Sequence, residues 1–207
     1  MPNASTVVHT NLVPNSTKTV LLKVITFDDL WSNYIHGDPY EDPTGAYENQ
    51  CAIRMSVTLH KLGIEMKSFS AKTVKPAQGS KTIGRILMDG KPTATRAEEM
   101  GNWLALRPFA GLPAAEDITG LDWESKVKGR TGIIAFSRYW HRASERSSPA
   151  SGGHIDLWNG FRTTYGGFKQ TTAVVGRQMG LNAAGPEDNR WWSDLRNAEN
   201  ISFWEIR

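Results

Sequence analysis

The N-terminal half of the chain carries hydrophobic side chains at helical spacing. Over "VITFDDLWSNYIHGDP" (24–39), apolar residues recur at the spacing of one helix face. Thr26 is placed to cap this helix, and Gly37 is placed to end it. A second helix is predicted over residues 51–62, where apolar side chains share one face and Gly63 follows as a stop.

A third helix is predicted over "TRAEEMGNWLAL" (95–106), because Thr95 and Glu98 form the pattern of a capping box. The connection before it, residues 67–94, is rich in Lys, Gly and Ser. It contains one short apolar run, "IGRILM" (83–88), which favours a strand.

The C-terminal half is dominated by strand-like segments, predicted over residues 129–140, 152–160 and 199–207. Between the last two lie a Gly- and Thr-rich insertion, 161–186, and a short helix predicted over 186–198. Helices come first and strands follow, without alternation. This order predicts an α+β fold in which N-terminal helices pack on an antiparallel sheet.

Length and composition are those of a single domain. The chain has 207 residues, of which 39% are hydrophobic, enough for one core. We expect a flexible tail over residues 1–20 and one domain over 21–207. The tail lacks the basic start and apolar block of a secretory signal, and no window has the length of a membrane span. We therefore expect a chain made in the cytoplasm without a signal peptide.

The charge of the chain is a mild basic excess. The net charge is +3, and the Lys and Arg residues are scattered, with "KVKGR" (126–130) as the densest short group. Nucleic-acid binders usually concentrate such charge in one stripe. We therefore expect a solvated basic surface, with neither nucleic acid nor a membrane as a partner.

The only cysteine of the chain, Cys51, begins the second predicted helix within "YENQCAIRMSVTLHKLG" (47–63). One cysteine excludes an internal disulfide and zinc sites built on Cys pairs. A lone thiol is most often a small buried hydrophobe. On the first turn of a helix, however, the local field favours the thiolate and hence a nucleophile. Composition and spacing leave both interpretations open.

A nucleophilic thiol requires a histidine that takes its proton and returns it to the leaving group. The chain contains five histidines: His9, His36, His60, His141 and His154. His60 lies too far along the predicted helix of Cys51 to reach the thiol. On position we favour His154, which follows two glycines and opens a strand, over His141 in a polar loop.

Two motifs, "ENQCAIRMS" and "GHIDLWNG", resemble those of the fourth family of type VI secretion amidase effectors. The likeness extends from about residue 24 to the C-terminus and includes "FDDLWSNY", "GRTGIIAF" and the closing "FWEI". These effectors are papain-like peptidoglycan endopeptidases related to the NlpC-type cell-wall amidases. The resemblance therefore implies a papain-like, NlpC-type α+β fold.

The resemblance also implies the chemistry. Cys51 would be the nucleophile and His154 the general base and acid, with no metal or organic cofactor. The bond cleaved would join γ-D-glutamate to meso-diaminopimelate in a peptidoglycan stem peptide. Such effectors are injected by the type VI machinery into the periplasm of a rival cell, and the producer makes an immunity protein that covers the cleft.

The third catalytic residue departs from the family pattern. Some members have an aspartate eleven positions after the histidine, where this chain has Tyr165. The nearest alternative is Asp156, which shares a strand face with His154 and is placed to orient the imidazole. Asp188 and Asp194, near the C-terminal helix, are further candidates. Members with a cysteine pair behind the histidine strand also differ from this chain, which has one cysteine.

Two other features each have two interpretations. Trp158, on the face of His154 and Asp156, either lines a peptide cleft or belongs to the core. Arg54, one turn after Cys51, either binds a substrate carboxylate or has a solvated or structural role. We expect the loop 141–153 and the connection 67–94 to border the cleft.

Two other functions fit the same residues. One is a papain-like thiol acyltransferase or protease that acts on proteins. The other is a non-enzymatic basic module that binds an anionic polymer. Replacing Cys51 separates these classes, since a binding module tolerates the change and an enzyme loses turnover.

Overall fold

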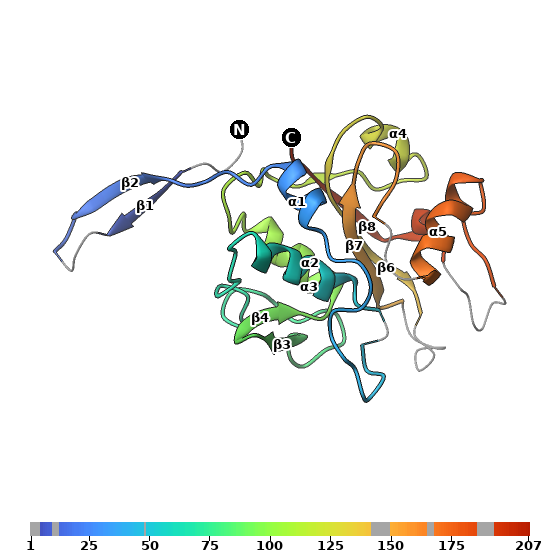
Figure 1. The fold of residues 1–207 in the computed structure, drawn as a ribbon, viewed down its shortest axis with the longest axis horizontal. Helices are drawn as coiled ribbons and strands as arrows, with labels where there is room; N and C mark the ends of the chain where they lie inside the picture. The colour runs from blue at the N-terminus through green and yellow to red at the C-terminus, as the bar shows by residue number, and fades with distance from the viewer. Residues whose placement is uncertain (1–4, 10–12, 48, 142–149, 165–167, 186–192) are drawn as a thin grey trace.

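The structure, a computed structural model, describes residues 5–9, 13–47, 49–141, 150–164, 168–185 and 193–207 (Figure 1). Within these residues the helices are α1 (Phe27–Asn33), α2 (Cys51–Lys61), α3 (Ala97–Ala105), α4 (Trp123–Val127), α5 (Phe168–Gln178) and the 3-10 helix η2 (Leu195–Asn197). The strands are β1 (Ser5–His9), β2 (Thr17–Leu21), β3 (Arg85–Met88), β4 (Lys91–Ala94), β5 (Glu116–Asp117), β6 (Gly132–Trp140), β7 (Gly152–Trp158) and β8 (Asn200–Glu205).

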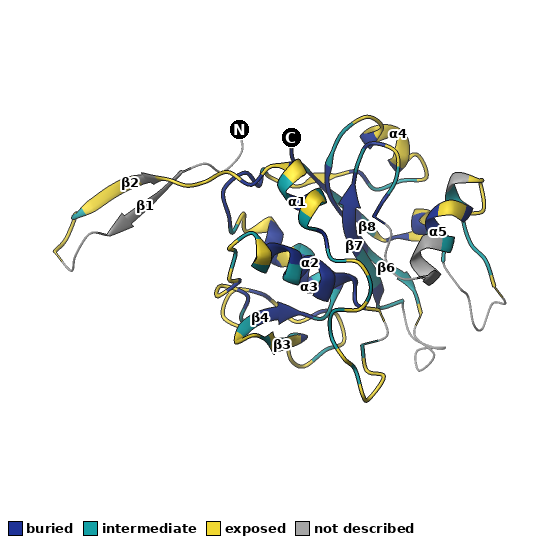
Figure 2. Ribbon diagram, in the orientation of Figure 1, coloured by how far each residue is buried: buried dark blue, intermediate teal, exposed yellow. Residues whose placement is uncertain are grey.

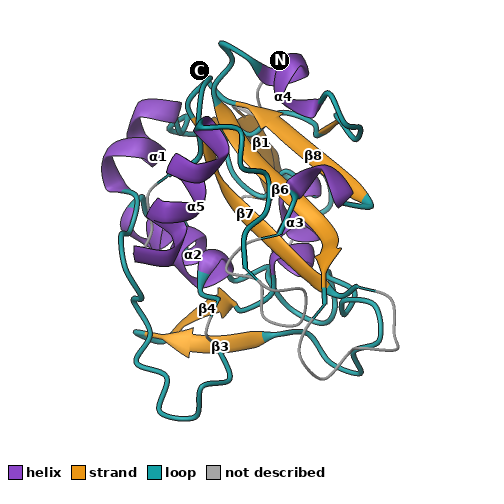
Figure 3. Cartoon of the chain, turned by 90° about the vertical axis from the view of Figure 1, so that its right-hand side faces the viewer, coloured by secondary structure: helices purple, strands orange, loops and turns teal. Residues whose placement is uncertain are grey.

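The largest sheet has four antiparallel strands in the order β5-β8-β6-β7. Figure 3 shows β6, β7 and β8 side by side. In the register of β6 and β7, Phe136 lies opposite His154 and Ile134 lies opposite Asp156. Because β7 is the edge strand, only one of its two sides forms backbone hydrogen bonds within the sheet. Its outer groups are left for other partners, and α2 packs against this strand.

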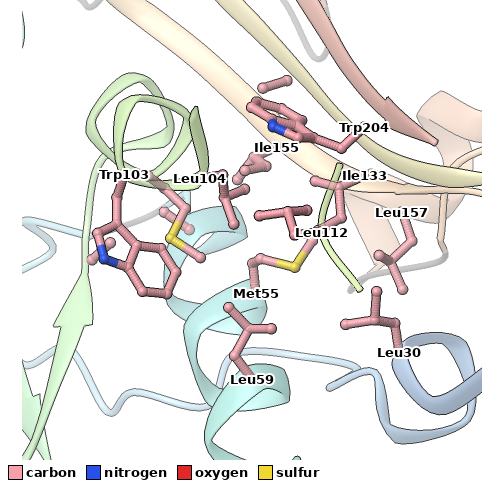
Figure 4. Close-up of a cluster of buried hydrophobic side chains, with 14 of the residues drawn as sticks. Leu30, Met55, Leu59, Trp103, Leu104, Leu112, Ile133, Ile155, Leu157 and Trp204 are labelled. Atoms are coloured by element: carbon pink, nitrogen blue, oxygen red, sulfur yellow. The ribbon is translucent and has the colours of Figure 1, made fainter. Parts of the chain in front are cut away.

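Hydrophobic side chains cover both faces of the sheet because residues alternate along each strand. One face packs on α1, α2 and α3 in a cluster whose labelled members appear in Figure 4: Leu30, Met55, Leu59, Trp103, Leu104, Leu112, Ile133, Ile155, Leu157 and Trp204. The other face packs on α4 and η2 through Ile134, Phe136, Trp158, Ile201 and Phe203. Buried residues accordingly run along the long strands and the inner sides of α2 and α3 (Figure 2).

The predicted α+β class with an antiparallel sheet is confirmed. Helix α1 has the predicted cap: the backbone N–H of Asp29 donates to the Thr26 hydroxyl, and the Thr26 backbone N–H donates to the Asp29 carboxylate. The second predicted helix and the three predicted long strands are also present. These elements are the ones with long apolar patterns or local caps.

The predicted capping box of the third helix is wrong. Helix α3 begins at Ala97 with Arg96 as its N-cap, and no side chain caps it. The backbone N–H of Thr95 instead donates to the carbonyl of Gly84 over 2.9 Å. This bond continues the β3–β4 hairpin by one residue, so the helix starts later than the sequence pattern suggests.

Several short elements were not predicted. The apolar run 83–88 does contain a strand, β3, but its partner β4 and the elements β5 and α4 were missed. The insertion 161–186 contains α5. Of the helix predicted over 186–198, residues 186–192 lie outside the described residues, and the rest contains η2.

The segment expected to be a flexible tail contains an antiparallel hairpin of β1 and β2, which extends away from the rest of the chain (Figure 1). Its flexibility, and the assignment of residues 21–207 to one domain, stay predictions. Among the described residues, no helix has the length and apolar character needed to cross a membrane.

Candidate active site

Cys51 is the first residue of α2, and its side chain is only 5% exposed. The residue before it, Gln50, does not cap the helix with its side chain. The Gln50 amide instead exchanges two hydrogen bonds with the backbone of Tyr40, at 2.8 and 3.0 Å. These bonds fix the loop that leads into α2 and so fix the position of the thiol. The first turn of a helix has backbone N–H groups without intrahelical acceptors, and Cys51 stands at this turn.

His154 lies on the edge strand β7 and forms a hydrogen bond with Cys51. Its Nε2 lies 3.3 Å from Oδ2 of Asp156, which leaves Nδ1 as the ring nitrogen for the thiol. The backbone N–H of Ile155, on the same strand, also donates to the sulfur. The structure thus brings the three predicted residues, Cys51, His154 and Asp156, into one network.

The carboxylate of Asp156 is fully buried. Besides His154, it accepts hydrogen bonds from the Thr164 hydroxyl and, over 2.8 Å, from the backbone N–H of Leu157. A buried carboxylate with several donors keeps a single orientation. Asp156 therefore holds the imidazole in one orientation, with Nε2–H directed at Oδ2.

The electrostatics of the pair favour a thiolate and an imidazolium. Burial raises the pKa of the Cys51 thiol, but the hydrogen bond and charge of His154 outweigh burial, with help from Arg54, and the pKa is lowered. Burial lowers the pKa of His154, but hydrogen bonds to Asp156 and Cys51 and their negative charges raise it to about 9. Each partner thus stabilises the charged form of the other.

Two further buried groups face this network, and sequence reasoning missed one of them. Arg54 is 6% exposed and pairs through Nη1 with Asp38, over 3.0 Å, and with the carbonyl of Gly37. It is therefore a structural cation beneath the thiol and not a group on the cleft. Burial raises the pKa of the Tyr34 phenol, and the nearby Asp156 raises it further, so the phenol stays protonated. The sequence marked Tyr34 only as one apolar position of a helix.

A cleft of about 260 Å³ opens beside Cys51. Its walls come from three segments and one aromatic side chain: Gly45, Ala46, Tyr47 and Asn49; Thr95, Arg96, Ala97 and Glu98; Ser151 and Gly153; and Trp140. The predicted border 141–153 is represented by its C-terminal end, while residues 142–149 lie outside the described residues. The connection 67–94, also predicted as a border, does not line the cleft in the described part of the chain. Its place is taken by the loop before Cys51 and by the start of α3.

The remaining candidates have other surroundings. Asp194 caps η2 and pairs with Arg196 over 2.7 Å. Asp188 and Tyr165 lie outside the described residues. His141 is exposed at the end of β6. Trp158 is a core residue, because its Nε1–H donates to the carbonyl of Val127 and its ring packs on Trp123.

Among the described residues, no group of three or more His, Cys, Asp or Glu side chains is placed to hold a metal ion. A thiol with a lowered pKa, an imidazole and an orienting carboxylate are the components of acyl transfer through a thioester.

Comparison with known proteins assigns a family to this architecture. The model of the family "Type VI secretion system (T6SS), amidase effector protein 4" matches residues 47–204. The crystal structure of the type VI effector Tae4 from Enterobacter cloacae is similar at a TM-score of 0.50 and 16% identity, over 88% of this chain and 96% of that chain. The effector–immunity complex Tae4–Tai4 from Salmonella Typhimurium is similar at a TM-score of 0.46 and 19% identity, over 87% and 97% of the respective chains. No curated protein matches the chain.

The chain is thus an amidase effector of a type VI secretion system, an antibacterial hydrolase of peptidoglycan. It belongs to the family of amidase effector protein 4, because the family model spans most of its length. The resemblance seen in its two sequence motifs is confirmed, and the fold agrees with that of the effector from Enterobacter cloacae.

Proposed function

We propose that the chain is a cysteine amidase that cleaves the bond between γ-D-glutamate and meso-diaminopimelate in peptidoglycan stem peptides. The observation that carries this proposal is the buried network of Cys51, His154 and Asp156 beside an open cleft. Membership in the amidase effector family supports the reaction class. The identity of the bond is the implication of the sequence motifs.

In the proposed mechanism, the Cys51 thiolate attacks the γ-carbonyl carbon of D-glutamate. The backbone N–H groups at the start of α2 stabilise the oxyanion that forms on the carbonyl oxygen. As the C–N bond breaks, the imidazolium of His154 gives its proton to the amine of diaminopimelate, and a thioester remains on the sulfur. Water, deprotonated by the neutral imidazole, then hydrolyses the thioester and regenerates the thiolate. These steps use no metal or organic cofactor.

The same proposal includes the finer fold class. A helix whose first residue is the thiol packs on an antiparallel sheet, and the edge strand of that sheet carries the imidazole. This placement is the one expected of a papain-like, NlpC-type fold. The placement supports this fold class because a helix holds the thiol and a strand holds the imidazole, so neither group depends on a loop.

The proposed setting follows from the family. The protein is loaded onto the type VI machinery, acts in the periplasm of the target cell, and meets its cognate immunity protein in the producer. We propose that the immunity protein covers the cleft beside Cys51, since access to the thiol runs through it.

The test compares the wild type with Cys51→Ala, His154→Ala and His141→Ala on isolated Gram-negative sacculi, with fragments resolved by mass. We expect the wild type and His141→Ala to split stems between D-glutamate and diaminopimelate, and the other two to be inert. His141 is the matched control because it is exposed. Intact sacculi together with cleavage of denatured protein would favour the acyltransferase or protease. A folded Cys51→Ala variant with full activity would contradict a thiol mechanism.

A further inference from the structure

The cleft beside Cys51 is lined by one cation and one anion among the described residues, Arg96 and Glu98. Each charge has an ionic partner within the protein, and the two side chains differ in exposure. The Glu98 carboxylate is 16% exposed and pairs with Arg138 over 2.7 Å, so its charge is compensated within the protein. Arg96 is 28% exposed and pairs with the buried Glu99 over 2.9 Å, so its guanidinium is the more exposed of the two charged groups.

One edge of the Arg96 guanidinium is fixed by the protein. Its Nη1 donates to the carbonyl of Thr82 over 2.7 Å and to the Glu99 carboxylate over 2.9 Å. Glu99 is fully buried and also accepts from the backbone N–H groups of Ala77 and Gly84. For Nε and Nη2 of Arg96 the described residues supply no acceptor. The cation is therefore held in place while part of its donor set is unused.

The stem of Arg96 passes close to the backbone of Gly84. A Cβ atom built on Gly84 would lie 2.5 Å from the Thr95 hydroxyl oxygen and 2.7 Å from Cγ of Arg96. The position therefore requires glycine, because any side chain would displace the arginine. An arginine whose head is already held by the protein binds an anion with little loss of side-chain entropy.

From these contacts we infer that Arg96 is a specificity residue that binds a free carboxylate of the stem peptide beside the scissile bond. This inference rests on the proposed function. The γ-linkage leaves the α-carboxylate of D-glutamate free, only a short aliphatic spacer from the carbonyl that Cys51 attacks. Guanidinium and carboxylate form charge-assisted, paired hydrogen bonds, which a neutral amide does not reproduce. We therefore assign the α-carboxylate of D-glutamate to Arg96.

Three purified stem peptides test the assignment: an unmodified one, one with D-isoglutamine in place of D-glutamate, and one amidated on diaminopimelate. We measure kcat/KM for the wild type, Arg96→Gln, Arg96→Lys and the control Arg196→Gln, whose arginine is exposed on η2 and lies outside the cleft. We expect the wild type to cleave the D-isoglutamine peptide about 10- to 100-fold more slowly than the unmodified one. Arg96→Gln loses this discrimination, Arg96→Lys keeps part of it, and Arg196→Gln keeps all of it.

Several outcomes would overturn the inference. If Arg96→Gln lowers kcat/KM by the same factor on all three peptides, the role of Arg96 is structural, through Thr82 and Glu99. If the wild type discriminates only against amidated diaminopimelate, the carboxylate bound is the other one, and the D-glutamate assignment fails. If the folded wild type cleaves none of the peptides, the proposed function itself fails, and the inference fails with it.

Discussion

Cys51 and His154 each favour the charged form of the other. Burial opposes both charges, yet the hydrogen bond and the opposite charge across it lower the pKa of the thiol and raise that of the imidazole. Asp156 adds to the second shift from the far side of the ring. In the proposed mechanism the reactive state is an ion pair, and its pH range is bounded by the two titrations.

The first prediction concerns this pH range. His154 must be protonated to supply the leaving amine, so kcat/KM of the wild type should fall as the pH rises through about 9. Asp156→Asn removes the carboxylate that raises the pKa of His154. The alkaline limb should then move to lower pH, and kcat/KM at its optimum should fall by about 10² to 10⁴-fold. A pH profile of unchanged shape with Asp156→Asn would show that the Asp156 carboxylate does not raise the pKa of His154.

The second prediction concerns Arg54, whose buried charge helps to lower the pKa of Cys51. In Arg54→Met this attraction is lost, so the pKa of the thiol should rise, whereas Arg54→Lys should keep part of the effect. The rate of alkylation by iodoacetamide, measured against pH, reports this titration without a substrate. Superimposable alkylation profiles for the wild type and Arg54→Met would contradict the electrostatic role.

At the scale of elements, the site depends on the packing of α2 on β7 and on the position of β7 at the edge of the sheet. The thiol reaches the strand from the helix side, where α2 packs on β7. Because β7 is an edge strand, the outward N–H of Ile155 is available to the sulfur. A central strand would have used this group in the sheet.

The third prediction concerns Glu99, which joins α3 to the connection before it. Its buried carboxylate accepts backbone N–H groups from Ala77 and Gly84. Glu99→Ala leaves these donors without a partner, so the free energy of unfolding should fall by on the order of 3 kcal/mol. Urea unfolding measures the change, with the exposed Glu41→Ala as the control. A Glu99→Ala variant as stable as this control would refute the anchoring role.

The same contacts explain which elements the sequence could predict. The cap of α1 joins Thr26 to Asp29, a local pair that is visible in the sequence. The expected cap of α3 failed because Thr95 bonds to Gly84, a partner set by the β3–β4 hairpin. Short elements such as β5 depend on pairing with distant strands, here β8, and have little pattern of their own.

At the scale of the whole molecule, the order of helices and strands was enough to predict an α+β fold with an antiparallel sheet. Cys51 and His154 were predicted as candidate site residues from position and motif, and Asp156 was the one of three aspartate candidates that shares a strand face with His154. The cleft was predicted less well. Its walls come from segments far apart in the chain, and the loop before Cys51 is placed by the pairing of Gln50 with Tyr40. Such long-range contacts leave no periodic signal.

The single cysteine of the chain permits the most direct test of the account. The protein is alkylated by iodoacetamide to graded extents, the modified fraction of Cys51 is measured by intact mass, and each sample is assayed on peptidoglycan sacculi. If Cys51 is the nucleophile, the cleavage rate should fall in proportion to the modified fraction and reach zero at full modification. Fully alkylated, folded protein that still cleaves the stem peptides would show that the thiol is not the nucleophile.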